Sequence, residues 1–83
     1  MNTLTIFTTG PDCHKCILTK AMFNRAGVFY TEIRLDDPVN AGVAADFIAA
    51  GHGVAPVVVD RIVNETWSDF RRDKIKASIK ARQ

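Results

Sequence analysis

The spacing of apolar residues along the chain changes several times between the two-residue period of a strand and the longer period of a helix. The apolar stretch from Leu4 to Thr8 predicts a first strand, which the breaker pair Gly10-Pro11 ends. A helical pattern follows from about Cys13 to Ala26, and Gly27 stands where a helix commonly stops. Two flanks of this helix carry its apolar side chains, with Ile17, Leu18, Ala21 and Met22 on one and Cys16 and Phe23 on the other.

A second strand and a second helix are predicted next. The stretch from Val28 to Leu35 is rich in β-branched and aromatic residues, which is typical of a strand. Asp37 and Pro38 are typical of an N-cap followed by the first position of a helix. This helix is expected to end at Gly51. Its inward face is expected to hold residues at i, i+4 and i+8, namely Val39, Val43 and Phe47.

The following segment predicts a pair of strands joined by a turn. Val57-Val58-Val59 begins a third strand, and part of the stretch from Ile62 to Trp67 should return as a fourth. The turn between them could lie at Asp60-Arg61 or near Asn64-Glu65, and the sequence leaves both positions open.

The last helix, expected from about Asp69 with Ile75 and Ile79 facing inward, is basic. Six of the eleven Lys and Arg residues fall between Arg71 and Arg82. The simplest interpretation is a solvated face whose cations also suit the negative end of the helix dipole. Docking on an acidic surface of a protein partner is the alternative. Nucleic acid fits poorly, because the net charge is only +2.

Length and composition predict one domain that spans residues 1–83. Hydrophobic residues make up 47% and charged residues 24%, which is typical of a folded, soluble domain. No apolar run approaches the ~18–20 residues of a membrane-spanning helix. The N-terminal Met1-Asn2-Thr3 lacks the basic start of a signal peptide, so we expect a protein of the reducing cytoplasm. We also expect a monomer.

Cys13-His14-Lys15-Cys16 is the strongest chemical signal in the chain, and it holds the only two cysteines. The motif lies between the first predicted strand and the first predicted helix. The N-terminus of a helix offers unpaired N–H groups and a partial positive charge beside the first sulfur. Both favour the thiolate, which is the nucleophile in disulfide exchange. Cys16 lies one turn further on, where it can attack a mixed disulfide made by Cys13, so the spacing predicts a two-electron thiol–disulfide switch.

Three other interpretations of the two cysteines stay open on the residues alone. A structural disulfide over so short a loop would stabilise the fold little. A zinc site needs four ligands, and only His14 and His52 remain, with His14 inside the loop itself, so the metal would be shared between molecules. Two ordinary buried thiols are the third interpretation. In a reducing compartment, a catalytic dithiol is the favoured one.

The predicted order of elements, βαβαββα, resembles that of the thioredoxin-like fold, which implies an α/β architecture with a four-stranded mixed sheet and three helices. Four segments make the resemblance more specific than the fold. These segments are Thr5-Ile6-Phe7-Thr8, Cys13-x-x-Cys16, Ala55-Pro56-Val57-Val58 and Trp67-Ser68-x-Phe70-Arg71. In their order and spacing, the chain resembles the NrdH-redoxins, small glutaredoxin-like proteins that donate electrons. A Cys-x-x-Cys alone would be a weak signal, but the resemblance covers nearly the whole chain.

The resemblance implies a role for each matching residue. Cys13 would attack a disulfide of the target protein, and Cys16 would resolve the mixed disulfide. Pro56 would be a cis-proline facing the sulfurs, which leaves the backbone at Ala55 free to pair with a substrate strand. The other partner-binding residues would be His14, Lys15, Trp67, Ser68, Phe70 and Arg71. For Trp67 and Phe70, plain core packing is an equal alternative.

The resemblance also implies the partners. The target would be ribonucleotide reductase, and electrons would come from thioredoxin reductase. The protein would need no cofactor beyond its own Cys13–Cys16 disulfide, and no metal, nucleic acid or membrane would take part. Two alternatives stay open: a glutathione-dependent glutaredoxin, and a non-enzymatic module that shares zinc or binds a protein. Spx and the arsenate-reductase-like proteins share the Cys-x-x-Cys opening, but they are longer and have no obvious place for the Trp67 segment.

The chain departs from the family pattern on both sides of the site. The segment before the motif, Thr9 to Asp12, lacks the family's lysine, and Asp69 replaces a glycine. Asp12 should raise the pKa of Cys13, whereas Lys15 and the helix dipole should lower it, so the sign of the net effect stays open. The negative charge of Asp69 and the bulk of Trp67 predict that glutathione is not the electron donor.

Overall fold

A four-stranded mixed sheet forms the middle of the computed structural model, which describes residues 3–83. Met1 and Asn2, part of the N-terminal stretch discussed above, lie outside the described residues. The strands are β1 (Leu4–Thr8), β2 (Thr31–Arg34), β3 (Val57–Asp60) and β4 (Glu65–Ser68), in the spatial order β2-β1-β3-β4. β1 pairs parallel with β2 and antiparallel with β3, and β3 pairs antiparallel with β4. The thioredoxin-like fold expected from the sequence is confirmed.

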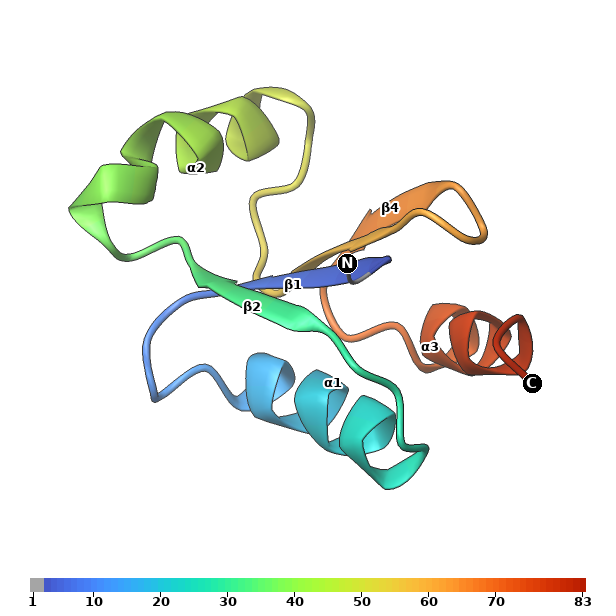
Figure 1. The fold of residues 1–83 in the computed structure, drawn as a ribbon. Helices are drawn as coiled ribbons and strands as arrows, with labels where there is room; N and C mark the ends of the chain where they lie inside the picture. Colours follow the sequence, from blue (N-terminus) through green and yellow to red (C-terminus); the bar gives the residue numbers. More distant parts are fainter. Residues whose placement is uncertain (1–2) are drawn as a thin grey trace.

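Helices cover both faces of this sheet (Figure 1). The helices α1 (His14–Arg25) and α3 (Arg72–Lys80) lie together on one face. The other face carries α2 (Ala41–Ala49), which a short 3-10 turn, η1 (Pro38–Asn40), precedes. No helix among residues 3–83 has the length and apolar character needed to cross a membrane.

The alternation of side chains along β1 divides the interior into two parts. Leu4 and Ile6 are fully buried and pack with Phe23 of α1 and Ile75 of α3. Phe7 points to the opposite face, where its ring lies edge-on to that of Phe47 of α2, with centroids 4.8 Å apart. The main core therefore lies between the sheet and the pair α1–α3, and α2 covers a smaller apolar contact.

The first helix begins and ends close to the predicted residues, but its buried face is different. Gly27, at φ +71°, donates its N–H to Asn24, and Val28 donates to Phe23, the two hydrogen bonds of a Schellman motif. The buried residues recur at i, i+3 and i+7, namely Cys16, Thr19 and Phe23. Thr19 can be buried because its hydroxyl donates to the backbone oxygen of Lys15 at 2.8 Å. The flank predicted around Ile17 and Leu18 is largely exposed, so that part of the prediction is wrong.

The second strand and second helix are both shorter than predicted. Residues 27–30 end α1 and lead away from it, so β2 begins only at Thr31, where pairing with β1 starts. The side chain of Asp37 accepts the N–H of Val39 at 3.1 Å, as expected of an N-cap, but the turn it begins is the 3-10 turn η1. Val39 is 82% exposed and Val43 39%, so the expected inward position of both is wrong, while Phe47 does face the sheet.

The hairpin turn uses residues from both predicted positions. Asp60 accepts the N–H groups of Ile62 and Val63 through its Oδ1 atom, and Asn64 adopts a positive φ of 56° before β4 begins. The last helix begins at Arg72, three residues later than expected from Asp69, because Asp69 has a φ of +74° that no α-helix accommodates. Ile75 is fully buried and Ile79 packs against the core, as predicted.

Candidate active site

Cys13 forms the N-cap of α1. Its backbone is extended, with φ −75° and ψ 97°, and its Sγ accepts the N–H of Cys16 at 3.2 Å. A sulfur at this position takes up one of the N–H groups that the first helical turn leaves unpaired. It also lies at the positive end of the helix dipole. Both interactions stabilise a thiolate when the cysteine is reduced.

The two cysteines are joined as a disulfide and differ in exposure. Their Cα atoms are 5.2 Å apart. Cys13 is half-buried, whereas Cys16 faces the interior and is only 2% exposed. A disulfide of another protein can therefore reach the sulfur of Cys13 and not that of Cys16. The arrangement provides one accessible sulfur, one sheltered sulfur and a reversible bond between them.

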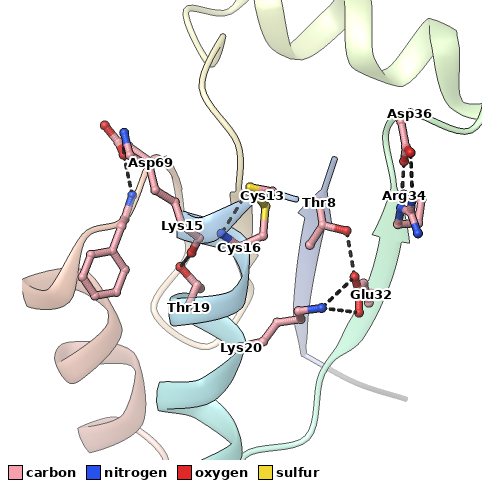
Figure 2. The surroundings of a disulfide bond; sticks show 11 residues. Thr8, Cys13, Lys15, Cys16, Thr19, Lys20, Glu32, Arg34, Asp36 and Asp69 are labelled. Carbon is pink, nitrogen blue, oxygen red and sulfur yellow. Dashed lines mark hydrogen bonds and ion pairs between the residues drawn. A yellow bond between two sulfur atoms is a disulfide. The ribbon is translucent and has the colours of Figure 1, made fainter. Parts of the chain in front are cut away.

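Asp69 connects the cysteine motif to the segment that precedes β3. Its carboxylate Oδ1 lies 2.8 Å from the Nζ of Lys15. Its N–H donates to the backbone oxygens of Val54 at 3.3 Å and Pro56 at 3.0 Å. Figure 2 shows the side chain of Lys15 extending from the first turn of α1 toward Asp69. The structure thus brings three of the predicted segments together around Asp69, whose pairing with Lys15 no sequence signal indicated.

The backbone at Asp69 explains how an aspartate stands where the resemblance expects glycine. Its φ of +74° lies in the left-handed region, which glycine adopts freely and which aspartate tolerates better than most residues. The hydrogen bond from Lys15 and that from the backbone N–H of Phe70 hold the pKa of Asp69 below its ordinary value. Asp69 is therefore an anion at neutral pH, directly beside the cysteine motif.

The other predicted partner-binding residues lie at the ends of the strands and helices around this site. The bond between Ala55 and Pro56, directly before β3, is cis, and Pro56 is buried. Ser68 ends β4, and its Oγ lies 3.1 Å from the Nδ1 of His52, a contact that no sequence signal indicated. The remaining three are His14, exposed on the first turn of α1, Phe70, half-buried, and Arg71, exposed and paired with Asp73 at 3.0 Å.

Trp67 does not lie at the surface of the site. Its side chain is 3% exposed and packs with Ile6, Val58 and Ile75 in the main core. Of the two roles left open for this residue, core packing is the one that the structure supports. The expectation that its bulk blocks a small ligand is wrong, because the indole points into the interior.

A polar network beside the cysteines also escaped the sequence analysis. Thr8, at the end of β1, is 1% exposed and donates its hydroxyl to Glu32 of β2 at 2.7 Å. Lys20 of α1 lies 3.2 Å from both carboxylate oxygens of Glu32. Burial raises the pKa of Glu32, but the hydrogen bonds from Thr8 and Lys20 outweigh it, so the net pKa is lowered. Figure 2 shows this network linking the edge strand to α1 next to the disulfide.

The ligand set for a metal is absent from the described part of the chain. Among residues 3–83, no group of three or more His, Cys, Asp or Glu side chains is placed to hold a metal ion. His52 contacts Ser68 and the ring of Phe47, on the side of α2.

Comparison with known proteins places the fold and the family. No protein-family model and no curated protein matches the chain. Among solved structures, the NrdH-redoxin of Escherichia coli, a glutaredoxin-like protein with a thioredoxin-like activity profile, is 32% identical over 89% of this chain and 91% of its own, with a TM-score of 0.74. A glutaredoxin of Archaeoglobus fulgidus is 22% identical over 95% of this chain and 87% of its own, with a TM-score of 0.76. A thioredoxin-like protein is 20% identical over 98% of this chain and 99% of its own, also with a TM-score of 0.76.

The two more distant matches show the fold alone, whereas the first carries a family assignment. An identity of 32% that extends over 89% of the chain agrees with the resemblance found in the four sequence segments. The half-buried Cys13, bonded to the buried Cys16 at the N-terminus of α1, supplies a redox centre. On this evidence the chain belongs to the NrdH-redoxins, and it is a thiol–disulfide oxidoreductase.

Proposed function

We propose that this protein carries electrons from thioredoxin reductase to ribonucleotide reductase, in a reducing cytoplasm. The proposal is carried by the accessible Cys13 at the N-cap of α1, in a chain that is 32% identical to an NrdH-redoxin with a thioredoxin-like activity profile. The oxidoreductase chemistry follows from the site, whereas the two partners are inferred from the family.

The proposed reaction uses only the two cysteines. The thiolate of Cys13 attacks a disulfide of the target, forms a mixed disulfide and releases one target thiolate. The thiolate of Cys16 then attacks the Sγ of Cys13, which forms the Cys13–Cys16 disulfide and releases the second target thiol. Two electrons have then passed to the target. Thioredoxin reductase, a flavoprotein, returns two electrons to the Cys13–Cys16 disulfide. Because Cys16 is only 2% exposed, it does not react with the target directly and remains available for this second step.

A protein partner would dock over the surface that surrounds Cys13. The exposed residues His14, Lys15 and Arg71 border this surface, and Val54, directly before Ala55, is 46% exposed. The backbone at Ala55 could pair with an extended segment of the target. The buried Trp67 would support this surface from within and not touch the partner.

The choice between two electron sources tests the proposal. With NADPH, thioredoxin reductase and a disulfide substrate, we expect NADPH consumption that depends on this protein. With NADPH, glutathione reductase and millimolar glutathione, we expect little NADPH consumption. The ammonium of Lys15 is already bound by Asp69, and the family's lysine before the motif is missing, so no free cation of the motif is left to hold the anionic tripeptide. Efficient turnover with glutathione would move the protein to the glutathione-dependent glutaredoxins.

The target is tested separately. With NADPH and thioredoxin reductase as the only source of electrons, ribonucleotide reductase should form deoxyribonucleotides when this protein is added. The matched control is the Cys13→Ser variant, which should give no product. Reduction of a small disulfide without reduction of ribonucleotide reductase would disprove the proposed target while leaving the proposed reductase in place.

A further inference from the structure

The cation within the cysteine motif is held by an anion from a distant part of the chain. The Nζ of Lys15 lies 2.8 Å from the Oδ1 of Asp69, and about half of each side chain is exposed, 51% and 44%. In Figure 2 the side chain of Lys15 extends toward Asp69, on the side away from the two sulfur atoms. A lysine two residues after Cys13 would otherwise be free to turn toward that sulfur.

Asp69 is well fixed for this purpose. Its N–H donates to the backbone oxygens of Val54 and Pro56, and its carboxylate also accepts the N–H of Phe70 at 2.7 Å. The φ of +74° is one that glycine would adopt with less strain, so the backbone conformation itself does not require an aspartate. Compared with glycine, aspartate adds a carboxylate at this position. That carboxylate reaches another segment of the chain through its ion pair with Lys15.

We propose that Asp69 is a positioning residue for the thiol chemistry, because it binds the ammonium of Lys15 and so withdraws that cation from Cys13. The Cys13 thiolate is then stabilised by the helix N-terminus and the N–H of Cys16 more than by Lys15. If Lys15 were released, its charge would approach the thiolate and favour it over the thiol. The inference rests on Cys13 being the attacking thiol, as proposed above, and does not depend on which reductase supplies the electrons.

The other charged groups around the motif are present in every variant in which Lys15 or Asp69 is replaced. Asp12 and His14 flank Cys13 in the chain. Arg34, the last residue of β2, binds Asp36 on the loop that follows. Asp36 also accepts a backbone hydrogen bond from Gly10, and the two interactions hold its pKa at about 2. Arg71, near Asp69, is itself paired with Asp73 at 3.0 Å. A comparison of variants cancels these constant contributions.

A double-mutant cycle tests the proposal in a Cys16→Ser background, where Cys13 is the single thiol. Four proteins are compared: the Cys16→Ser parent, the parent with Asp69→Asn, the parent with Lys15→Gln, and the parent with both substitutions. The measurement is the pH midpoint of alkylation by iodoacetamide, checked by the ultraviolet absorbance of the thiolate. We expect Asp69→Asn to lower the midpoint by about 0.5 pH units or more when Lys15 is present. When Lys15 is replaced by glutamine, the same substitution should lower the midpoint by less than half as much.

The alkylation rate alone would be a weaker measure. A fall of about 0.5 in the midpoint triples the thiolate fraction at low pH, but a less basic thiolate is less nucleophilic, so the rate rises only about twofold. In the protein with both cysteines, the same release of Lys15 should make the reduction potential more oxidising, because it stabilises the reduced form.

Two results would overturn the proposal. An equal shift with and without Lys15 would mean that Asp69 acts only as a nearby anion, and no shift at all would mean that the pair has no effect on Cys13. Asp73→Asn, which breaks the comparable Arg71 pair outside the motif, should leave the midpoint unchanged. Asp69→Gly, which suits the positive φ, replaces Asp69→Asn if the latter fails to fold.

Discussion

Replacing Cys13 with serine is expected to reduce disulfide reductase activity to the background measured without protein. Cys13 is the half-buried sulfur at the N-cap of α1, and serine there cannot form the mixed disulfide on which the reaction depends. Cys16→Ser should also stop multiple turnover, but it should preserve the first step, because Cys13 remains accessible. The two single variants therefore fail at different stages of one reaction.

Trapping and labelling distinguish these two stages. Incubated with an oxidised target protein, Cys16→Ser should accumulate a mixed disulfide that appears as a heavier species on a non-reducing gel, and Cys13→Ser should not. In the reduced wild-type protein, iodoacetamide should modify Cys13 faster than Cys16, which is 2% exposed. Faster modification of Cys16, or trapping by Cys13→Ser, would reverse the assignment of attacking and resolving residues.

Local signals in the sequence predicted most of the boundaries that place the active site. The Cys-x-x-Cys between an apolar strand and a helical pattern fixed the position of Cys13 at the helix N-terminus. The glycines at 27 and 51 ended α1 and α2, each with the two hydrogen bonds of a Schellman motif. These features depend on residues close together in the chain, so their physical cause is visible in the sequence.

Contacts between distant segments were not predictable in this way. Lys15 lies in α1 and Asp69 in the segment between β4 and α3, and nothing near either residue in the sequence indicates that their charges meet. The same is true of Thr8, Glu32 and Lys20, which come from β1, β2 and α1. Each of these interactions requires the sheet order and the helix positions to be known first. The charged residues are visible in the sequence, but their pairing is not.

Burial was predicted poorly for polar residues that are buried and for apolar residues that are exposed. Thr19 is fully buried, although it is polar, because a hydrogen bond to its own helix satisfies its hydroxyl. Ile17 is 49% exposed, although it is apolar, because it lies on the side of α1 away from the core. A periodicity of apolar residues ranks these two positions in the wrong order, since it takes no account of local hydrogen bonds.

Asp60 is the clearest case of a buried charge that no pattern in the sequence indicated. The residue was considered only as a turn position, yet its carboxylate is 1% exposed at the end of β3. Arg82 binds it through two hydrogen bonds, of 2.8 and 3.0 Å, and Ser78 of α3 donates to it as well. Arg82 also reaches Thr3 at 3.0 Å, so one cluster joins the sheet, α3 and the chain just before β1.

Asp60→Asn is therefore expected to destabilise the protein by about 3 kcal/mol, near the low end for breaking a buried ion pair. The low end applies because the side chain of Arg82 is 13% exposed and can turn its charge toward water. For a domain of this size, that loss lowers the melting temperature by roughly 12–24 °C. Thermal or urea unfolding of the oxidised proteins measures it, with Asp73→Asn as the control, since its exposed pair with Arg71 should contribute little.

The pH dependence of this difference gives a second measurement. Burial raises the pKa of Asp60, but the hydrogen bonds from Arg82, Ser78 and the backbone of Ile62 outweigh it and leave the pKa below its ordinary value of 3.8. A group whose pKa is lower in the folded state contributes stability above its unfolded pKa, and this contribution is lost as the pH falls through the folded pKa. The stability gap between wild type and Asp60→Asn should thus be constant near neutral pH and narrow below about pH 4. A gap that stays the same down to low pH would mean that the carboxylate charge does not stabilise the fold, and that the variant is weakened by packing alone.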